Sequence, residues 1–309
     1  MTSTQAQSRS LSAPEPPQLP VGWGLNNQSR RLTDVLIGRP DFFEWVPLNA
    51  ISAMTFANAE RLGYRFDREA AMSQHRAMIQ VYEDAGVAVH YLDCDPGLPS
   101  SVFARDSSFM TPWGAVVASI QTPPRRRDYA VVARFYLEAE IPIWKWVTAG
   151  HFEGGDFAIV APGACLLGYA GTRSTREGAD QVAAWMAAEG WEALTVPLAP
   201  QFVHMDACLV MLADDLALIC EDALEAYVLD WLRGHGISWL PVSYRDCVRL
   251  GGNLVNLGEG RILSMAHNVT VNERLRAEGF DVSVIDYDQF ALGGGGVHCS
   301  CHELRRDLA

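Results

Sequence analysis

The stretch that decides the fold is EDAGVAVHYL, residues 83–92, in which an amphipathic helix ends at Gly86 and a β-rich run follows at once. Glycine adopts the left-handed backbone conformation at low cost, so it marks the position just after a helix. The same kind of junction recurs four times further along the chain. The four are LEAEIPIWKW (137–146), AAEGWEALTV (187–196), LRGHGISWLPV (232–242) and RAEGFDVSVI (276–285).

These junctions define a repeating unit. They fall at positions 86, 140, 190, 236 and 279, which lie 54, 50, 46 and 43 residues apart. Between successive helices the chain carries two short runs with strand character. The paired runs are Val102–Phe109 with Ala115–Ile120, Phe157–Val160 with Ala164–Tyr169, Cys208–Leu212 with Leu216–Cys220, and Leu254–Leu257 with Arg261–Met265.

Each unit is therefore strand, strand, helix, strand, and a period near fifty that recurs about five times indicates a repeat architecture. The helices exclude an all-β propeller, and a doubly wound Rossmann sheet would lack a hairpin in every unit. We predict an α/β fold in which five ββαβ units form a closed ring with pseudo-fivefold symmetry.

Composition limits the function. The chain has 309 residues, of which 49% are apolar, so it can bury a substantial core. It carries 24 Lys and Arg against 37 Asp and Glu, a net charge of −13, which argues against a nucleic-acid partner because such proteins need a basic face. No run approaches the ~20 apolar residues of a membrane helix.

The ends and the cysteines suggest the organisation and the compartment. Residues 1–20 are rich in Ser, Pro and Gln and lack the apolar core of a signal peptide, so we predict a disordered tail there and a single folded domain over 21–309. The seven cysteines are odd in number and irregularly spaced, which predicts a reducing, cytoplasmic location. Five of them sit in apolar surroundings and are predicted to be structural: Cys94, Cys165, Cys208, Cys220 and Cys247.

A second regularity concerns reactive side chains. Asp106, Asp156, Asp206, Asn253 and Cys299 follow one another at intervals of 50, 50, 47 and 46 residues. If the units are related by rotation, these positions converge on one axis and line a common pocket. Two more reactive residues lie beside them: Glu153, and His204, which in a strand would face the same side as Asp206.

Clustered carboxylates repel one another unless a cation lies among them. A planar guanidinium suits such a cage, because its N–H groups pair with carboxylates bidentately. A thiol beside a histidine then suggests nucleophilic attack on the guanidinium carbon. A metal ion is the competing occupant, although the cluster His298, Cys299, Cys301 and His302 is spaced more tightly than a structural zinc site. Cys299 alone could be a buried apolar residue, but four preceding glycines indicate close approach of the backbone.

Four motifs in this order resemble the guanidino-modifying superfamily with the pentein fold. They are FARD (103–106), HFEGGD (151–156), HMDA (204–207) and LGGGGVHCSCHELRR (292–306). The superfamily includes arginine deiminases, agmatine deiminases, dimethylarginine dimethylaminohydrolases and amidinotransferases. The resemblance extends from about Leu32 to Arg306 and implies a pentein α/β-propeller with the active site at its centre.

The resemblance also implies roles for individual residues. Cys299 corresponds to the nucleophile, His204 to the general acid/base and Glu153 to the acid that assists proton transfer. The expected substrate-binding residues are Asp106, Asp206 and Asp156 around the guanidinium, with Arg125 and Arg173 for a substrate carboxylate. The two arginines occur in PPRRRD (123–128) and GTRSTREGA (171–179).

From this resemblance we expect a hydrolase that acts on the guanidino group of arginine or an arginine-like compound. A covalent amidino-thioether on Cys299 would release ammonia or an alkylamine and a ureido product such as citrulline. No cofactor and no metal are expected. The partner is a small cationic guanidino compound, with neither nucleic acid nor membrane involved, and a homo-oligomer is left open.

Two alternatives remain. HFEGGD is typical of the hydrolases, whereas HMD and HCSC followed by two arginines resemble amidinotransferases, in which an amine replaces water as the acceptor. The other alternative is a non-catalytic guanidino-binding protein.

Overall fold

The computed structural model describes residues 22–48 and 50–309, so the predicted tail over 1–20 lies outside the described residues. The described chain forms a mixed α/β fold with five three-stranded sheets. Four of these sheets are built from consecutive segments, each with the order strand, strand, helix, strand. This is the repeating unit that the junctions predict.

The four consecutive units share one design. The first two strands of each form an antiparallel hairpin, and the third pairs in parallel with the second after a helical crossover. A parallel pair needs such a crossover because its strands run in the same direction. The units are β3 (Ser108–Thr111), β4 (Gly114–Val117), α3 (Asp128–Glu138) and β5 (Ile143–Trp146); β6 (Phe157–Ala161), β7 (Ala164–Tyr169), α4 (Arg176–Ala188) and β8 (Glu192–Pro197); β9 (Leu209–Ala213), β10 (Leu216–Ile219), α5 (Ala226–Gly234) and β11 (Ser238–Pro241); and β12 (Val255–Gly258), β13 (Arg261–Met265), α7 (Val269–Ala277) and β14 (Asp281–Ile285).

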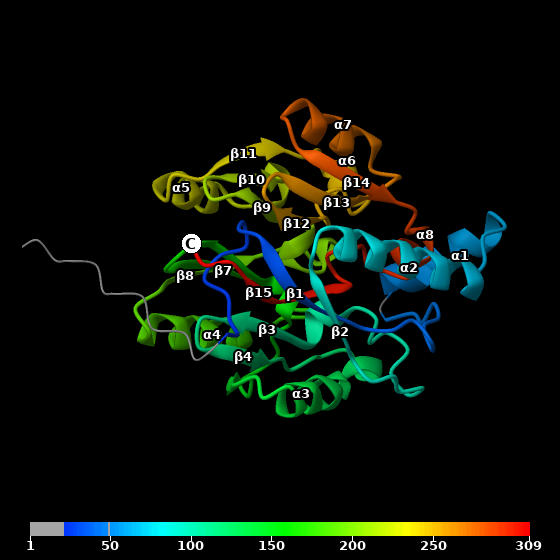
Figure 1. Cartoon of the computed structure of the whole chain (residues 1–309), viewed down its shortest axis with the longest axis horizontal. Coiled ribbons are helices and arrows are strands. Elements are labelled where there is room, and N and C mark those ends of the chain that lie inside the picture. The colour runs from blue at the N-terminus through cyan, green and yellow to red at the C-terminus, as the bar shows by residue number, and fades with distance from the viewer. Residues whose placement is uncertain (1–21, 49) are drawn as a thin grey trace, which may run out of the picture.

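The fifth sheet combines segments from opposite ends of the chain. Its order is β15-β1-β2, with β1 antiparallel to β15 and parallel to β2. Figure 1 shows β1 in blue beside the red β15 at the centre of the molecule. The elements are β1 (Leu32–Ile37), α1 (Ala50–Arg61), α2 (Arg68–Asp84), β2 (Ala88–Tyr91) and β15 (Cys301–Arg306).

The backbone at the five junctions agrees with the sequence prediction. The four junction glycines all have positive φ, between 71° and 92°, and Glu140 takes φ 54° at the corresponding position. Each of these residues follows the end of a helix and begins the turn into an edge strand, namely β2, β5, β8, β11 or β14. The repeat therefore extends to single backbone positions, even where the residue is not glycine.

One predicted strand begins later than expected. The run Val102–Phe109 was expected to be extended, but Ala104–Ser107 forms the 3-10 turn η1 and β3 begins only at Ser108. Similar turns, η3 (Gly154–Asp156) and η5 (Met205–Ala207), precede β6 and β9. A 3-10 turn at the start of the inner strand is thus a recurring part of the unit. The remaining short elements are η2 (Pro123–Arg125), η4 (Pro200–Phe202), η6 (Glu221–Ala223), α6 (Tyr244–Cys247) and α8 (Asp288–Leu292).

The sheets contact one another in chain order. Strand β15 packs beside β3, β6 beside β9, β9 beside β12 and β12 beside β1, while η1 contacts η3 and η3 contacts η5. The long helices lie toward the outside of the molecule (Figure 1), and the apolar cores fill the space between sheets and helices. The contacts among η1, η3 and η5 bring the three aspartate-bearing turns together.

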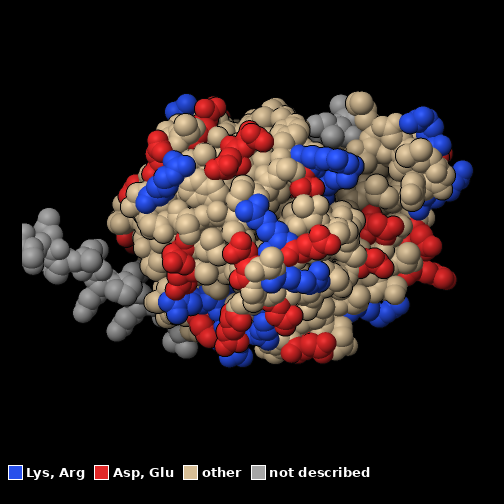
Figure 2. Space-filling model, turned by 90° about the horizontal axis from the view of Figure 1, so that it is seen from above, with Lys and Arg blue, Asp and Glu red and all other residues tan. Residues whose placement is uncertain are grey.

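One face of the molecule shows how the charged side chains are distributed. On the face in Figure 2, basic and acidic side chains are interspersed and neither sign forms an extended patch. Among the described residues, no helix combines the length and the apolar character that crossing a membrane requires.

Candidate functional site

The three 3-10 turns carry the first part of the site. Glu153 immediately precedes η3, His204 immediately precedes η5, and Asp106 lies within η1. The turns approach one another closely at glycines: a Cβ on Gly154 would strike the carbonyl oxygens of Arg105 and Ser108. The HFEGGD motif therefore needs its glycines so that neighbouring turns can meet.

His204 lies between two carboxylates. Its Nε2 is 3.1 Å from Glu153 Oε2 and its Nδ1 is 3.4 Å from Asp106 Oδ1. Burial lowers the pKa of His204, but the charges of Asp106 and Asp156 outweigh it and raise the pKa to about 9. At neutral pH the imidazole is therefore protonated and can donate a proton.

Two buried arginines balance the charge of these carboxylates. Arg173 donates from Nε to Glu153 Oε1 at 3.0 Å and from Nη2 to Glu153 Oε2 at 2.5 Å, and it lies 3.3 Å from Asp106 Oδ2. Arg125 pairs with Asp106 and Asp128. Burial raises the pKa of Glu153, but the Arg173 and His204 pairs outweigh it and hold the pKa well below its ordinary value. Arg125 and Arg173, expected to bind a substrate carboxylate, here contact the carboxylates of the cage itself.

Cys299 forms the second part of the site. It lies between the glycine run 293–296, which follows α8, and strand β15. A Cβ on Gly295 would meet the Phe103 ring at 2.6 Å, and one on Gly296 would meet Asn253 Oδ1 at 2.5 Å. The glycines thus let the loop pack directly against the residues that surround the thiol, as the sequence predicts.

The Cys299 thiol faces both an amide and a carboxylate. Asn253 Nδ2 donates to its Sγ at 3.1 Å, and Asp206 Oδ2 lies 3.8 Å from the same sulfur. Burial, followed by the charges of Asp206 and Asp106, raises the pKa of Cys299 well above the ordinary value. At neutral pH the thiol is therefore protonated.

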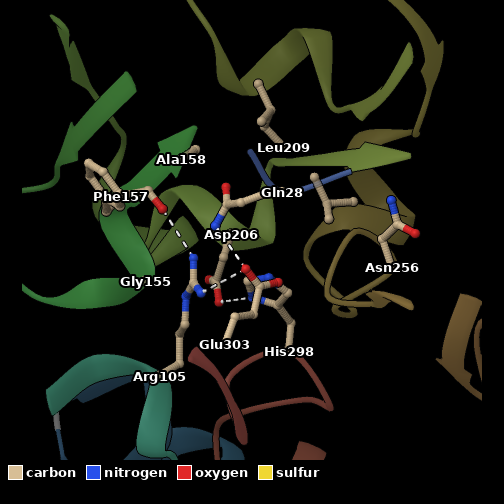
Figure 3. A pocket seen from close by; sticks show the side chains of 11 residues that line it. Gln28, Arg105, Gly155, Phe157, Ala158, Asp206, Leu209, Asn256, His298 and Glu303 are labelled. Atoms are coloured by element: carbon tan, nitrogen blue, oxygen red, sulfur yellow. Dashed lines mark hydrogen bonds and ion pairs between the residues drawn. The ribbon is translucent and has the colours of Figure 1, made fainter. Parts of the chain in front are cut away.

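Asp206 also connects the thiol to a buried polar network. Its Oδ2 lies 2.8 Å from His298 Nδ1, and this pair lowers the Asp206 pKa against the opposing effect of burial. Figure 3 shows the adjoining cavity, where Arg105 donates to the Phe157 carbonyl at 3.1 Å and lies 3.8 Å from Glu303. His204 and Asp206 do not share one face of a strand, because they occupy a turn and have separate partners.

A pocket of about 60 Å³ joins the two parts. His204, Asp206, Asn253 and Cys299 all line it, so the predicted nucleophile and acid/base share one space. Asp156 has a supporting position instead, since its Oδ1 accepts a hydrogen bond from the Met205 backbone at 2.9 Å. This bond fixes the turn that carries His204 and Asp206.

The sequence alone does not show which groups Asn253 and His298 contact in the site. The fifty-residue periodicity places Asn253 at the common pocket, but nothing in the sequence pairs its amide with Cys299. The sequence places His298 beside Cys299, as a neighbour of the site or a potential metal ligand.

The cluster His298, Cys299, Cys301 and His302, which the sequence offers as a possible metal site, is divided between the loop before β15 and β15 itself. Cys301 and His302 belong to β15, and His302 Nε2 lies 2.8 Å from the Tyr136 hydroxyl. A different trio, Asp106, Glu153 and His204, offers potential ligand atoms within 4.8 Å of one another. Both of its carboxylates already have arginine partners.

All seven cysteines are free thiols. Four of the five predicted to be structural are buried, but Cys94 is exposed, with its Sγ 3.4 Å from Asp41 Oδ2. The prediction of an apolar setting for Cys94 was therefore wrong, because the segment after β2 runs along the surface.

Sequence comparison gives a family match. The family model described as eukaryotic N,N dimethylarginine dimethylhydrolase matches residues 40–306. The uncharacterised protein YkgA of Bacillus subtilis is 26% identical over 236 residues, which cover 76% of this chain and 80% of that protein. An arginine deiminase of Rhodococcus opacus is 25% identical over 299 residues, covering 84% of this chain and 72% of the deiminase.

Solved structures share the fold. The N-terminal domain of ArgZ, an arginine dihydrolase from cyanobacteria, gives a TM-score of 0.76 at 20% identity and covers 88% of this chain and 97% of that domain. SxtG, an amidinotransferase from Microseira wollei, gives 0.77 at 16% identity and covers 92% of this chain and 97% of SxtG. Together with the match over residues 40–306, these findings show that the chain belongs to the N,N-dimethylarginine dimethylhydrolase family of the guanidino-modifying pentein superfamily.

Proposed function

We propose that this protein is a cysteine-dependent hydrolase of the guanidino group of arginine or an arginine-like compound. The observation that carries the proposal is the pocket lined jointly by Cys299, His204 and Asp206. Two buried carboxylates, Asp106 and Glu153, lie beside His204. Those carboxylates already bind a guanidinium in the structure, that of Arg173. Carboxylates that can hold a guanidinium beside a thiol and a protonated imidazole suit attack on a guanidinium carbon.

The first half of the reaction forms a covalent intermediate. As the cationic substrate enters, its charge lowers the pKa of Cys299 and the thiol loses its proton to water. The thiolate attacks the central guanidinium carbon, forming a C–S bond. His204 then protonates the departing nitrogen, the C–N bond breaks, and an amidino-thioether remains on Cys299. General acid catalysis of this kind contributes about 10²–10⁴-fold.

The second half restores the enzyme. Neutral His204 takes a proton from water, and the resulting hydroxide adds to the amidino carbon. Collapse of this adduct breaks the C–S bond and releases a ureido product, such as citrulline, with the Cys299 thiolate. Asp106, Asp206 and Glu153 orient the guanidinium, and Asp156 holds the turn that bears His204. No step in this sequence requires a metal or an organic cofactor.

The wider arrangement belongs to the same proposal. The contacts from sheet to sheet support a five-bladed ring, the pentein propeller, that forms a single catalytic domain over residues 21–309 with its site at the axis. Seven free cysteines support a reducing, cytoplasmic location.

The test is incubation of the purified protein with arginine, agmatine and methylated arginines, with and without a primary amine acceptor. Release of ammonia or an alkylamine with a ureido product supports the hydrolase. A new guanidino product that appears only with the amine would identify an amidinotransferase, and binding without any product would favour the non-catalytic alternative.

The Cys299→Ser variant tests the covalent step, because serine is a poorer nucleophile at neutral pH. We expect loss of turnover with guanidino binding largely retained, and mass spectrometry of trapped wild-type enzyme should place the adduct on Cys299. An adduct on another cysteine, or turnover by the variant, would contradict the assignment.

A further inference from the structure

The amide of Asn253 has three hydrogen-bond partners on the loop that carries Cys299. Its Nδ2 donates to Cys299 Sγ at 3.1 Å, and its Oδ1 accepts from the backbone N–H groups of His298 at 3.0 Å and Cys299 at 3.3 Å. The residue is fully buried. It precedes β12 and so comes from a different sheet than β15, which follows Cys299.

These partners fix which end of the amide faces the sulfur. Two backbone N–H donors require an acceptor, so the carbonyl oxygen of Asn253 must lie toward the loop. The NH₂ group is then left to face Cys299 Sγ. The orientation thus follows from hydrogen-bond chemistry.

The other side chains near the sulfur favour the neutral thiol or are shared with other partners, whereas the backbone of Gly296 lowers the pKa of Cys299, as Asn253 does. Asp206 and Asp106 add negative charge, and the Tyr287 hydroxyl donates to Ser300 Oγ at 2.9 Å. His298 is paired with Asp206, and His204 with Glu153 and Asp106. Asn253 is the only side-chain hydrogen-bond donor to Cys299 Sγ in the described part of the chain. A donor to sulfur stabilises the thiolate relative to the thiol.

We infer that Asn253 acts on the nucleophile, holding Cys299 Sγ toward the pocket and stabilising its thiolate through the Nδ2–H···S bond. This inference rests on the proposed function only in taking Cys299 as the nucleophile. Reactivity of the sulfur toward a simple alkylating agent tests it without any guanidino substrate.

Asn253→Asp is the sharpest variant. It keeps an oxygen for the two backbone donors and replaces the NH₂ group by an oxygen that repels a thiolate. Asn253→Ala removes both functions. Gly296→Ala keeps Asn253 but disturbs both donors to the sulfur, because the new Cβ would lie 2.5 Å from Asn253 Oδ1 and Gly296 itself contacts Cys299 through its backbone.

The matched control is Asn256→Asp. Asn256 is also buried and lies within β12, but its Nδ2 donates to the carbonyls of Met211 and Leu212. The same chemical change is thereby made three residues away, without contact with Cys299. Exposed Cys94 gives an internal control in every sample.

The experiment treats the full chain with iodoacetamide between pH 5.5 and 10 and measures alkylation of each cysteine by peptide mass spectrometry. We expect Asn253→Asp to slow alkylation of Cys299 at pH 7 by about tenfold or more, the range for a hydrogen bond to a charged group, and to move its profile to higher pH. Asn253→Ala should change it in the same direction. Cys94, and Cys299 in Asn256→Asp, should react as in the wild type.

The inference is overturned if the Cys299 profile is the same in Asn253→Asp and Asn253→Ala as in the wild type. Alkylation of buried Cys165 would reveal a variant that fails to fold, and the Asn253 variant in which Cys165 stays unreactive then decides the question. Absence of turnover with every guanidino compound would refute the proposed function and leave the alkylation result intact.

Discussion

Both ring nitrogens of His204 face carboxylates, and this contact sets its charge. In the folded protein the pKa of His204 is about 9, whereas in the unfolded chain it has its ordinary value near 6.5. Between these two pH values the folded protein therefore keeps a proton on His204 that the unfolded chain has lost. Because the folded-state pKa is the higher one, His204 contributes stability that is fully present below pH 6.5 and is lost as pH rises through 9.

We therefore expect the free energy of unfolding to fall by ~3 kcal/mol between pH 6.5 and 9. Urea titrations at half-unit intervals measure this slope. His204→Gln should flatten it while keeping a polar group between Glu153 and Asp106. A wild-type curve that is flat over this range would show that the imidazole is not held in its charged form.

Arg173 gives a prediction about substrate class. A substrate with a carboxylate offers Arg173 a new anionic partner when its guanidinium takes Glu153 and Asp106, whereas agmatine offers none. We expect Arg173→Ala to raise KM for arginine by about tenfold or more and to change KM for agmatine little. Arg125→Ala should show a weaker form of the same effect.

Steady-state kinetics with arginine and agmatine as a matched pair measure this difference. Equal losses for both substrates, or none for either, would mean that the arginines do not recognise a carboxylate.

The sequence could predict which residues line the site better than it could predict which partners they contact. The periodic aspartates predict a cage, and the structure groups one of them, Asp106, with Glu153 and His204. The pairing of Arg173 with that cage could not be predicted, because a long side chain takes its rotamer from partners that only the fold brings close. The same holds for the bond between Asn253 and Cys299, which joins positions 46 residues apart.

The helix–strand junction and the 3-10 turn are the elements that repeat. Glycine signals the junction in the sequence, so the units could be counted and most strands placed. The conformation of the turns η1, η3 and η5 could not be predicted, since short segments such as ARDS have no helical or strand pattern of apolar residues and the turns are held by contacts with one another. Their effect on the site is large because they give His204 and Asp206 different partners within one pocket.

The junction at Glu140 gives a prediction for stability. Its φ of 54° is costly for a residue with a Cβ, whereas the other four junctions have glycine. We expect Glu140→Gly to raise the free energy of unfolding by ~0.5–1 kcal/mol after the entropic cost of glycine. Urea unfolding measures the change.

Gly190→Ala is the matched reverse change. It should destabilise by about 1 kcal/mol through backbone strain alone, because a Cβ there meets nothing within 4 Å. If both variants matched the wild type, conformational cost at the junctions would not be limiting.

At the scale of the whole molecule, the fifth sheet is closed by residues from opposite ends. Ile37 pairs with Cys301 and Leu32 with Arg306, so the strand after the nucleophile is fixed by the first strand of the fold. The backbone of Asp307 continues the contact by donating to the Arg31 carbonyl.

We expect removal of residues 301–309 to abolish both the cooperative unfolding transition and any turnover, because β1 loses one partner and Cys299 loses its anchor. Removal of 308–309, which are exposed, should leave both nearly unchanged. Circular dichroism during thermal unfolding and the guanidino assay check the two truncations. If removal of 308–309 impaired unfolding and turnover as much as removal of 301–309, the result would argue against β15 as the element that anchors Cys299.

The same closure has a consequence during synthesis. Strand β1 leaves the ribosome 264 residues before β15 begins, counted from Ile37 to Cys301, which is on the order of 15–50 s at ordinary translation rates. Throughout that interval a nascent chain presents one edge of β1 without its partner, and unpaired edges invite pairing with other chains. A prematurely released chain would carry the same open edge and no anchored thiol, so aborted translation products would be inert toward substrate and attractive to chaperones.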